Sequence, residues 1–146
     1  MIAQTIQLSL APVFVLVALG HLFVTLSARL GRIVDRSREL QDRYRETSGT
    51  DHEIIVRQIR ETDLRIDLIG RSLRAMVISA LGIGLTVFIL FLEEMIGINL
   101  QDVAGGVFML SLGALMWGLL LFLRETRVAL AALRIPRGFL ETRPDE

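Results

Sequence analysis

Residues 103–123 read VAGGVFMLSLGALMWGLLLFL and contain no charged side chain. A helix needs about 20 apolar residues to cross the hydrocarbon core of a bilayer, and a helical backbone satisfies its own polar groups there. Residues 1–28 and 75–92 are equally free of charge. A soluble bundle is the alternative, but its helices would show exposed polar faces. The sequence therefore predicts an all-α membrane protein with three transmembrane helices, at about 8–28, 75–92 and 103–123.

The first apolar stretch is interpreted as a retained helix and not as a signal peptide. A signal peptide begins with positive charge and ends at a small-residue cleavage site, whereas residues 1–10 carry no charge and the stretch runs directly into an arginine-rich pattern. Pro12 falls in the first turns of this helix, where its missing N–H costs least. Residues 1–10 are expected to form an interfacial lead-in to the membrane.

The distribution of charge predicts the topology. The 16 basic and 16 acidic residues cancel, and every basic residue is an arginine. The segment 93–102 contains Glu93, Glu94 and Asp102 but no arginine, while all arginines fall in 29–74 and 124–146. Short loops rich in arginine stay in the cytoplasm. We therefore expect the N-terminus and the loop 93–102 outside, and the segment 29–74 and the tail 124–146 in the cytoplasm.

The cytoplasmic segment 29–74 is patterned as an antiparallel helical hairpin that extends the first two helices. Apolar positions recur at alternating steps of three and four, the spacing of a coiled-coil seam. The first helix is expected to run to about Glu46 and the second to start near Asp51, so the hairpin projects roughly 30 Å. Gly49 can take a left-handed stop position, and Thr50 with Glu53 matches a capping box. The seam positions are Leu26, Leu30, Ile33, Ser37, Leu40, Tyr44, Ile55, Ile59, Thr62, Ile66, Ile69, Leu73 and Met76.

Acidic and basic residues four apart support the exposed faces of these helices, each pair by a few tenths of a kcal/mol. The third helix is expected to continue past Arg124 to about Arg134, because Pro136 stops it. The four pairs are Glu39/Arg43, Glu53/Arg57, Glu61/Arg65 and Asp67/Arg71.

Three segments resemble a known family. They are IQLSLAPVFVLVALG at residues 6–20, RLGRIVDRSREL at 29–40 and FLRETRVALAALRI at 122–135. They are similar to the bacterial membrane-protein family catalogued as domain of unknown function 2721, over Gln4 to Ile135, with RIVDR at 32–36 as the most specific part. The resemblance implies a three-helix protein, here of the bacterial inner (cytoplasmic) membrane, and it implies no activity. His21 falls where a small or apolar residue is expected, so it is not interpreted as a family site.

The sequence lacks the residues that several classes of function require. Cysteine is absent, and His21 and His52 are far apart in sequence, so no metal-ligand cluster is indicated. No phosphate-binding loop, nucleophile elbow or dinucleotide motif occurs, and the membrane-embedded acids of a proton relay are not evident. A net charge of zero argues against a nucleic-acid partner. The expectation is a non-enzyme without catalytic, cofactor-binding or metal sites and with membrane lipids as partners.

One face of the first helix gathers polar and small side chains, again at steps of three and four. Polar groups within a span usually face protein or water. In a symmetric homo-oligomer this face could line an ion pathway, with Phe14 as a hydrophobic constriction and Arg32 and Asp35 at a charged cytoplasmic mouth. Helix packing against neighbours is the alternative use of the same face. The candidate pore-lining residues are Gln7, Ala11, Phe14, Ala18, His21, Thr25, Arg32 and Asp35.

The other functional hypothesis is a non-conducting scaffold or regulatory protein that binds a cytoplasmic protein partner through the hairpin. Arginines at the membrane boundary could hold anionic lipid headgroups or could serve only to set topology; these are Arg29, Arg71, Arg74, Arg124 and Arg127. A small-residue stripe on the second helix is assigned to helix packing. Its members are Ala75, Ser79, Gly82 and Thr86.

Overall fold

The structure is a computed structural model that describes residues 2–132 and consists there of three helices. They are α1 (Ile2–Glu46), α2 (Thr50–Ile96) and α3 (Gln101–Ala132). At 1.5 Å per residue, α1 and α2 are each about 70 Å long and α3 about 50 Å. The all-α prediction is confirmed, as are the end of the first helix at Glu46 and the start of the second within one residue of Asp51. The expected continuation of the third helix to Arg134 lies outside the described residues.

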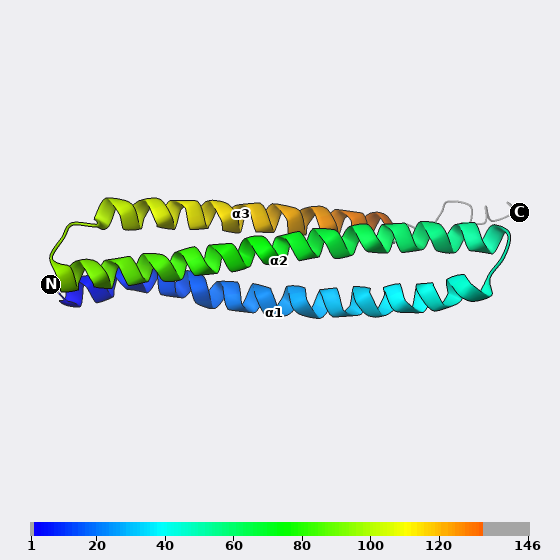
Figure 1. The fold of residues 1–146 in the computed structure, drawn as a ribbon, viewed down its shortest axis with the longest axis horizontal. Coiled ribbons are helices and arrows are strands. Elements are labelled where there is room, and N and C mark those ends of the chain that lie inside the picture. Colours follow the sequence, from blue (N-terminus) through cyan, green and yellow to red (C-terminus); the bar gives the residue numbers. More distant parts are fainter. Residues whose placement is uncertain (1, 133–146) are drawn as a thin grey trace, which may run out of the picture.

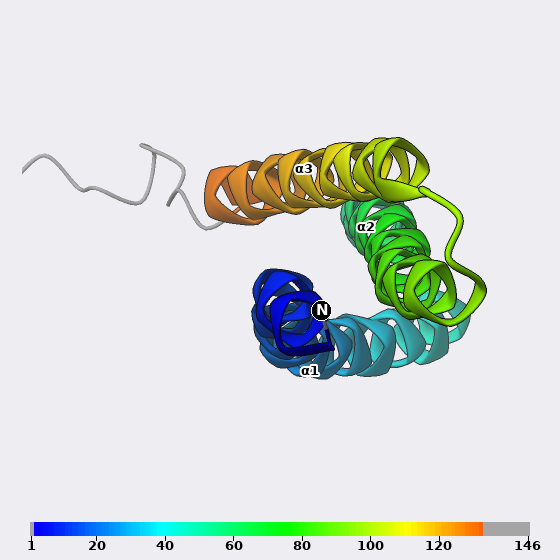
Figure 2. The same ribbon diagram turned by 90° about the vertical axis from the view of Figure 1, so that its left-hand side faces the viewer.

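The three helices run alternately up and down, with α2 in the middle (Figure 1). Viewed toward one end, α1 and α3 both lie against α2, and within the described part of the chain they barely touch one another (Figure 2). The connection between α1 and α2 lies far beyond the end of α3, so these two helices form a long hairpin that pairs within one chain (Figure 1).

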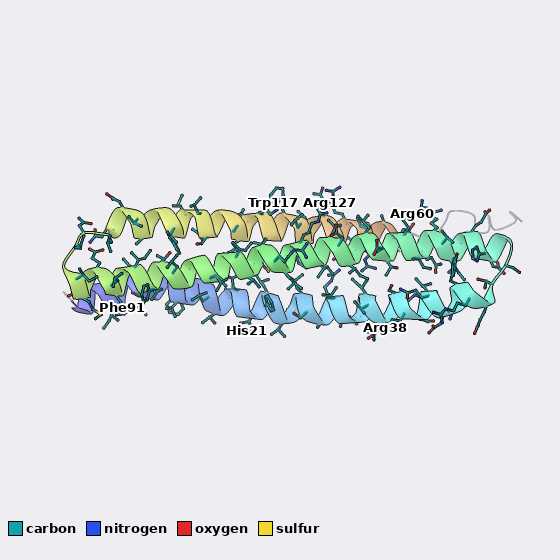
Figure 3. The ribbon with its side chains drawn as sticks, in the orientation of Figure 1. His21, Arg38, Arg60, Phe91, Trp117 and Arg127 are labelled. Carbon is teal, nitrogen blue, oxygen red and sulfur yellow. The ribbon has the colours of Figure 1, made fainter. Side chains whose placement is uncertain are left out.

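Each of the three helices is long and apolar enough to cross a membrane. Large apolar side chains cover the outer surface; for example, Phe14, Leu81 and Leu110 are 69%, 69% and 78% exposed. An exposed apolar surface of this extent is unusual for a soluble monomer, whereas lipid chains would cover it in a bilayer. Figure 3 shows Phe91 near the end opposite the hairpin tip, while Arg38 and Arg60 lie on the hairpin. Composition and structure together indicate a membrane protein.

Large apolar residues form the seam between α1 and α2. Every seventh residue of α1 from Pro12 is buried, and α2 presents a matching buried row. This is the packing that alternating three- and four-residue steps predict. The predicted seam is confirmed except at Tyr44, which is 43% exposed and stacks on His52 with ring centroids 4.4 Å apart. The rows are Pro12, Leu19, Leu26, Ile33 and Leu40 on α1, and Ile55, Thr62, Ile69, Met76 and Ile83 on α2.

Small residues form the seam between α2 and α3. The Ser72 hydroxyl donates to the carbonyl of Gly118 at 2.7 Å, and a Cβ at Gly118 would lie 3.2 Å from the Ser72 carbonyl oxygen. Small side chains allow helix backbones to approach closely. The small stripe predicted on the second helix lies in this seam: Ser79 and Thr86 are buried, and a Cβ at Gly82 would meet Ser111, which confirms its predicted packing role. The buried members of this seam are Ser72, Ser79 and Thr86 on α2, and Ala104, Ser111, Gly118 and Glu125 on α3.

Two glycines with positive φ shape the connections. Gly97 has φ 74° and ψ 19° and ends α2, with its N–H donating to Glu93 O at 2.8 Å. Gly49 has a positive φ of 76°, but its ψ of −142° is not left-handed helical, so the predicted left-handed stop is wrong and Gly49 is the N-cap of α2. The predicted capping box from Thr50 to Glu53 is wrong, because the cap falls on Gly49, which has no side chain to accept an N–H. The His52 N–H donates to Gly49 O at 3.1 Å instead.

Candidate functional site

The candidate pore-lining face of α1 is exposed along its length, although its member Arg32 also borders a pocket between α1 and α2. All eight of its members, Gln7, Ala11, Phe14, Ala18, His21, Thr25, Arg32 and Asp35, are exposed. Their helix packs on α2 through the separate row that contains Leu19 and Leu26. The face is therefore available to water, lipid or another subunit.

Two polar side chains of this face are bonded within their own helix. Thr25 Oγ1 donates to the carbonyl of His21 at 3.0 Å, and His21 Nδ1 donates to the carbonyl of Val17 at 3.1 Å. Such bonds satisfy polar groups locally. Nε2 of His21 takes no part in these two bonds and stays available to a neighbouring molecule. Figure 3 shows His21 pointing away from α2.

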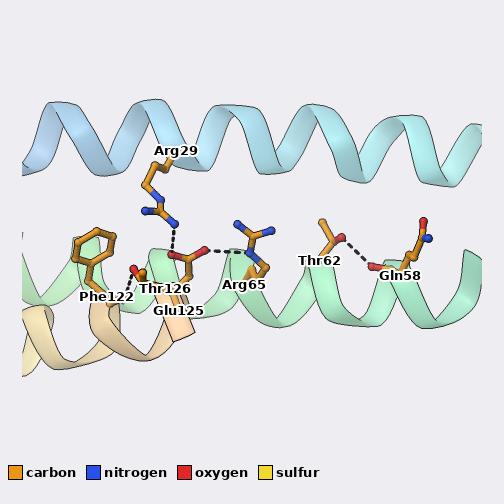
Figure 4. A network of polar contacts seen from close by, with 7 residues as sticks. All are labelled: Arg29, Gln58, Thr62, Arg65, Phe122, Glu125 and Thr126. Atoms are coloured by element: carbon orange, nitrogen blue, oxygen red, sulfur yellow. Dashed lines mark hydrogen bonds and ion pairs between the residues drawn. The ribbon is translucent and has the colours of Figure 1, made fainter. Parts of the chain in front are cut away.

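An ion-pair network around Glu125 connects the three helices. Glu125 of α3 is fully buried, and each of its oxygens accepts from an arginine of another helix. Nη2 of Arg29 on α1 donates to Oε2 at 2.9 Å, and Nε of Arg65 on α2 donates to Oε1 at 3.0 Å (Figure 4). We call Arg29, Arg65 and Glu125 the boundary triad. The triad connects α1, α2 and α3 at one height along the helices.

The α3 register explains why Glu125 is buried. Ala104, Ser111, Gly118 and Glu125 are seven residues apart, so Glu125 continues the small-residue row that faces α2. A charge in such a position must be paired. Arg29 also lies over the Phe122 ring, with 5.3 Å from its guanidinium carbon to the ring centroid. This contact holds the α1 arginine against α3.

Arginines line a pocket beside the triad. It has a volume of about 280 Å³ and lies between α1 and α2. Arg36 donates to Glu39 at 2.7 Å, and this bond lowers the pKa of the Glu39 carboxyl below its usual value. The Thr62 hydroxyl donates to Gln58 O at 2.8 Å (Figure 4). We call this space the arginine pocket; its lining is Arg29, Arg32, Ile33, Arg36, Thr62 and Arg65.

A second cavity lies near the hairpin tip, again between α1 and α2. Its volume is about 400 Å³. Its walls are mixed, with apolar residues from α2 and polar or aromatic residues from α1. They are Gln41, Tyr44, Arg45, Val56 and Ile59.

The predicted boundary arginines do not converge on one site. Arg29 lines the arginine pocket, whereas Arg71 pairs with Asp67 at 2.9 Å on the surface of α2. Arg74, Arg124 and Arg127 are exposed.

Two of the four predicted acid–base pairs differ in the structure. Arg57 pairs with Glu61 at 3.1 Å instead of with Glu53, and Arg65 pairs with Glu125 instead of with Glu61. The buried carboxylate attracts Arg65 more strongly than a solvated one does, because charges interact more strongly in a low dielectric. The pairs Glu39–Arg43 and Asp67–Arg71 form as predicted.

Sequence reasoning missed Glu125, Arg65 and Arg36 as site residues. By position alone Glu125 is one charge of the tail 124–146, although it follows the third apolar stretch by two residues. The seven-residue spacing from Ala104 through Gly118 could have identified it as a buried acid. Among the residues that the structure describes, no group of three or more potential metal ligands lies together.

The chain belongs to the family described as Protein of unknown function (DUF2721), whose model matches residues 9–135. No curated protein and no solved structure matches the chain.

Proposed function

We propose that the protein is a homo-oligomeric ion-conducting pore of the bacterial inner membrane, with α1 facing the pathway. The observation that supports this proposal is the exposure of the whole candidate face of α1, from Gln7 to Asp35. Polar side chains in a span face protein or water more often than lipid. A ring of identical subunits would give this face water or a neighbouring subunit to contact.

Ring geometry assigns a role to each end of the face. Phe14 is 69% exposed and would form a hydrophobic constriction in the span. Arg32 and Asp35 make no ion pair or hydrogen bond with any residue in 2–132 and would stand at the mouth. The proposal requires an oligomer, because within residues 2–132 α1 and α3 each pack on α2 and barely contact one another, so these helices do not surround a path.

Charge orients the pore across the membrane. The arginines of α1 and α2 lie toward the hairpin end, and Arg124 and Arg127 of α3 follow its apolar stretch on the same side. The short connection between α2 and α3 lacks arginine. By the positive-inside rule, the hairpin and the C-terminus are cytoplasmic and the N-terminus is outside. The proposed activity is conduction and not catalysis.

Planar-bilayer recording of the purified full-length protein tests the proposal. We expect single-channel currents, and we expect Phe14→Ala to raise the open probability because it removes the constriction. Phe88→Ala is the matched control: Phe88 is 61% exposed on α2, away from the candidate face, and its loss should leave currents unchanged. Absence of current at any voltage, tension or pH, or a monomeric or dimeric state in detergent, would contradict the proposal.

A scaffold or regulatory role is the second candidate, favoured by the cavity of about 400 Å³ near the hairpin tip. A cytoplasmic protein partner would insert an apolar side chain there against Val56 and Ile59. Because the chain contains no cysteine, Val56→Cys supplies a unique cross-linking site. A cross-link to another protein gives a product whose mass is not a multiple of the chain mass, and such products support this role. Products at multiples of the chain mass alone, which come from copies of the same chain, contradict it.

A further inference from the structure

The arginine pocket has the chemistry of an anion site, and we propose that it binds the phosphate of an anionic phospholipid headgroup. The inference rests on membrane insertion alone and is independent of conduction. Four guanidinium groups line a single pocket of about 280 Å³ between α1 and α2. Arginine is the residue best suited to phosphate, because its planar donors match the phosphate oxygens in pairs.

The carboxylates near the pocket do not neutralise it. Glu125 shares its single charge between Arg29 and Arg65, and Glu39 pairs with Arg36 from the exposed surface of α1. Arg32 has no ion-pair partner among residues 2–132. The carboxylate of Glu39 is also shared with Arg43, and no acidic residue lines the pocket itself, so the four arginines carry an excess of positive charge. The surplus favours an anion that brings a full negative charge.

The boundary triad also positions donors for a ligand. Glu125 binds Arg65 through Nε alone, so both terminal nitrogens of Arg65 stay unengaged and point toward α1 (Figure 4). Arg29 uses only Nη2 on Glu125. The side chains of Arg29 and Arg65 are each 26% exposed, so a headgroup can reach them. The buried carboxylate thus fixes two guanidinium groups and leaves most of their donors free.

The depth of the pocket favours a lipid over a soluble anion. Arg29 directly follows the first charge-free stretch, and Glu125 comes two residues after the third. Both therefore stand where the apolar spans end, which is the level of the headgroups. A phosphate held at this level lets its acyl chains run along the exposed apolar surface of the spans.

Lipid binding to the purified full-length protein tests the inference, with native mass spectrometry to count bound dioctanoyl phosphatidylglycerol. The pocket variant is Arg32→Gln with Arg36→Gln, both exposed side chains outside the triad. The matched control is Arg38→Gln with Arg60→Gln, which removes the same charge from the hairpin (Figure 3). We expect the pocket variant to weaken binding about tenfold or more, because charge-assisted hydrogen bonds are lost. The control should change binding less than about twofold.

Two parallel titrations identify the source of the anion. Dioctanoyl phosphatidylcholine should bind the wild-type protein much more weakly, since its headgroup has no net charge. Inorganic phosphate should compete only at far higher concentration, because it has no acyl chains to bury. The inference is overturned if the pocket and control variants lose binding equally, or if neither loses it. It is also overturned if phosphatidylcholine or inorganic phosphate binds as tightly as phosphatidylglycerol.

Discussion

Glu125 of α3 is the acidic residue that bonds to both other helices through arginines. It is a fully buried carboxylate, and its bonds to Arg29 and Arg65 connect α3 with both other helices. A buried charge stabilises a structure only when every partner is in place, and removal of one partner leaves an uncompensated charge. Among the described residues α1 and α3 otherwise barely touch, so the bond from Arg29 is one of the few contacts between them.

We expect Glu125→Gln to destabilise the protein by about 3 kcal/mol, because it leaves two half-buried arginines facing each other without a counter-charge. Glu61→Gln makes the same chemical change in the exposed ion pair with Arg57 and should cost less than about 1 kcal/mol. Unfolding of both variants by SDS titration in mixed micelles measures the difference. Equal midpoints would show that the boundary triad contributes no more than a surface pair.

At the scale of the helices, the two seams are built differently. Leucine and isoleucine fill the seam of α1 with α2, whereas serine, threonine and glycine bring α2 and α3 into close backbone contact. In lipid, close van der Waals packing replaces the hydrophobic effect as the source of helix association. The seam of α2 with α3 should therefore tolerate added volume poorly.

Gly118→Ala tests this close packing. A Cβ at Gly118 would lie 3.2 Å from both the Ser72 carbonyl oxygen and Cγ of Met76, so we expect a loss of about 1–3 kcal/mol from overpacking. Gly113→Ala on the same helix meets nothing within 4 Å and should be neutral or stabilising by up to about 1 kcal/mol. The SDS-unfolding midpoints of the two variants provide the comparison, and a Gly118→Ala protein as stable as Gly113→Ala would refute the close contact.

Helix positions and seams could be predicted from sequence because periodicity repeats over many turns. The seam through Leu26, Ile33 and Ile69 is an example, since each buried position reinforces the next. Glu125 also follows a repeat, seven residues after Gly118. That repeat consists of small residues and is easily overlooked, so a single charge after an apolar stretch resembles a tail residue. The partners of Arg65 and Arg57 depended on the tertiary register of the helices.

The whole molecule combines apolar helices with a strongly segregated charge. Arginine-rich ends lie together because α1 and α3 run in the same direction, opposite to α2. Charge segregation was predictable by simple position in the sequence. The packing of α1 and α3 on one central helix was not, because the apolar surfaces of a membrane protein do not specify which helix pairs they join. The polar face of α1 is exposed in a single copy.

Accessibility of single cysteines on α1 tests most directly whether this face meets water. The natural chain contains no cysteine, so Ala18→Cys and Thr25→Cys report on the candidate face, while the exposed neighbours Val17→Cys and Val24→Cys report on an adjacent face at the same depth. With the protein in membranes, we expect a charged, membrane-impermeant thiol reagent to modify the first two and not the second two. Modification of neither pair, or of both pairs equally, would contradict a water-filled pathway along α1.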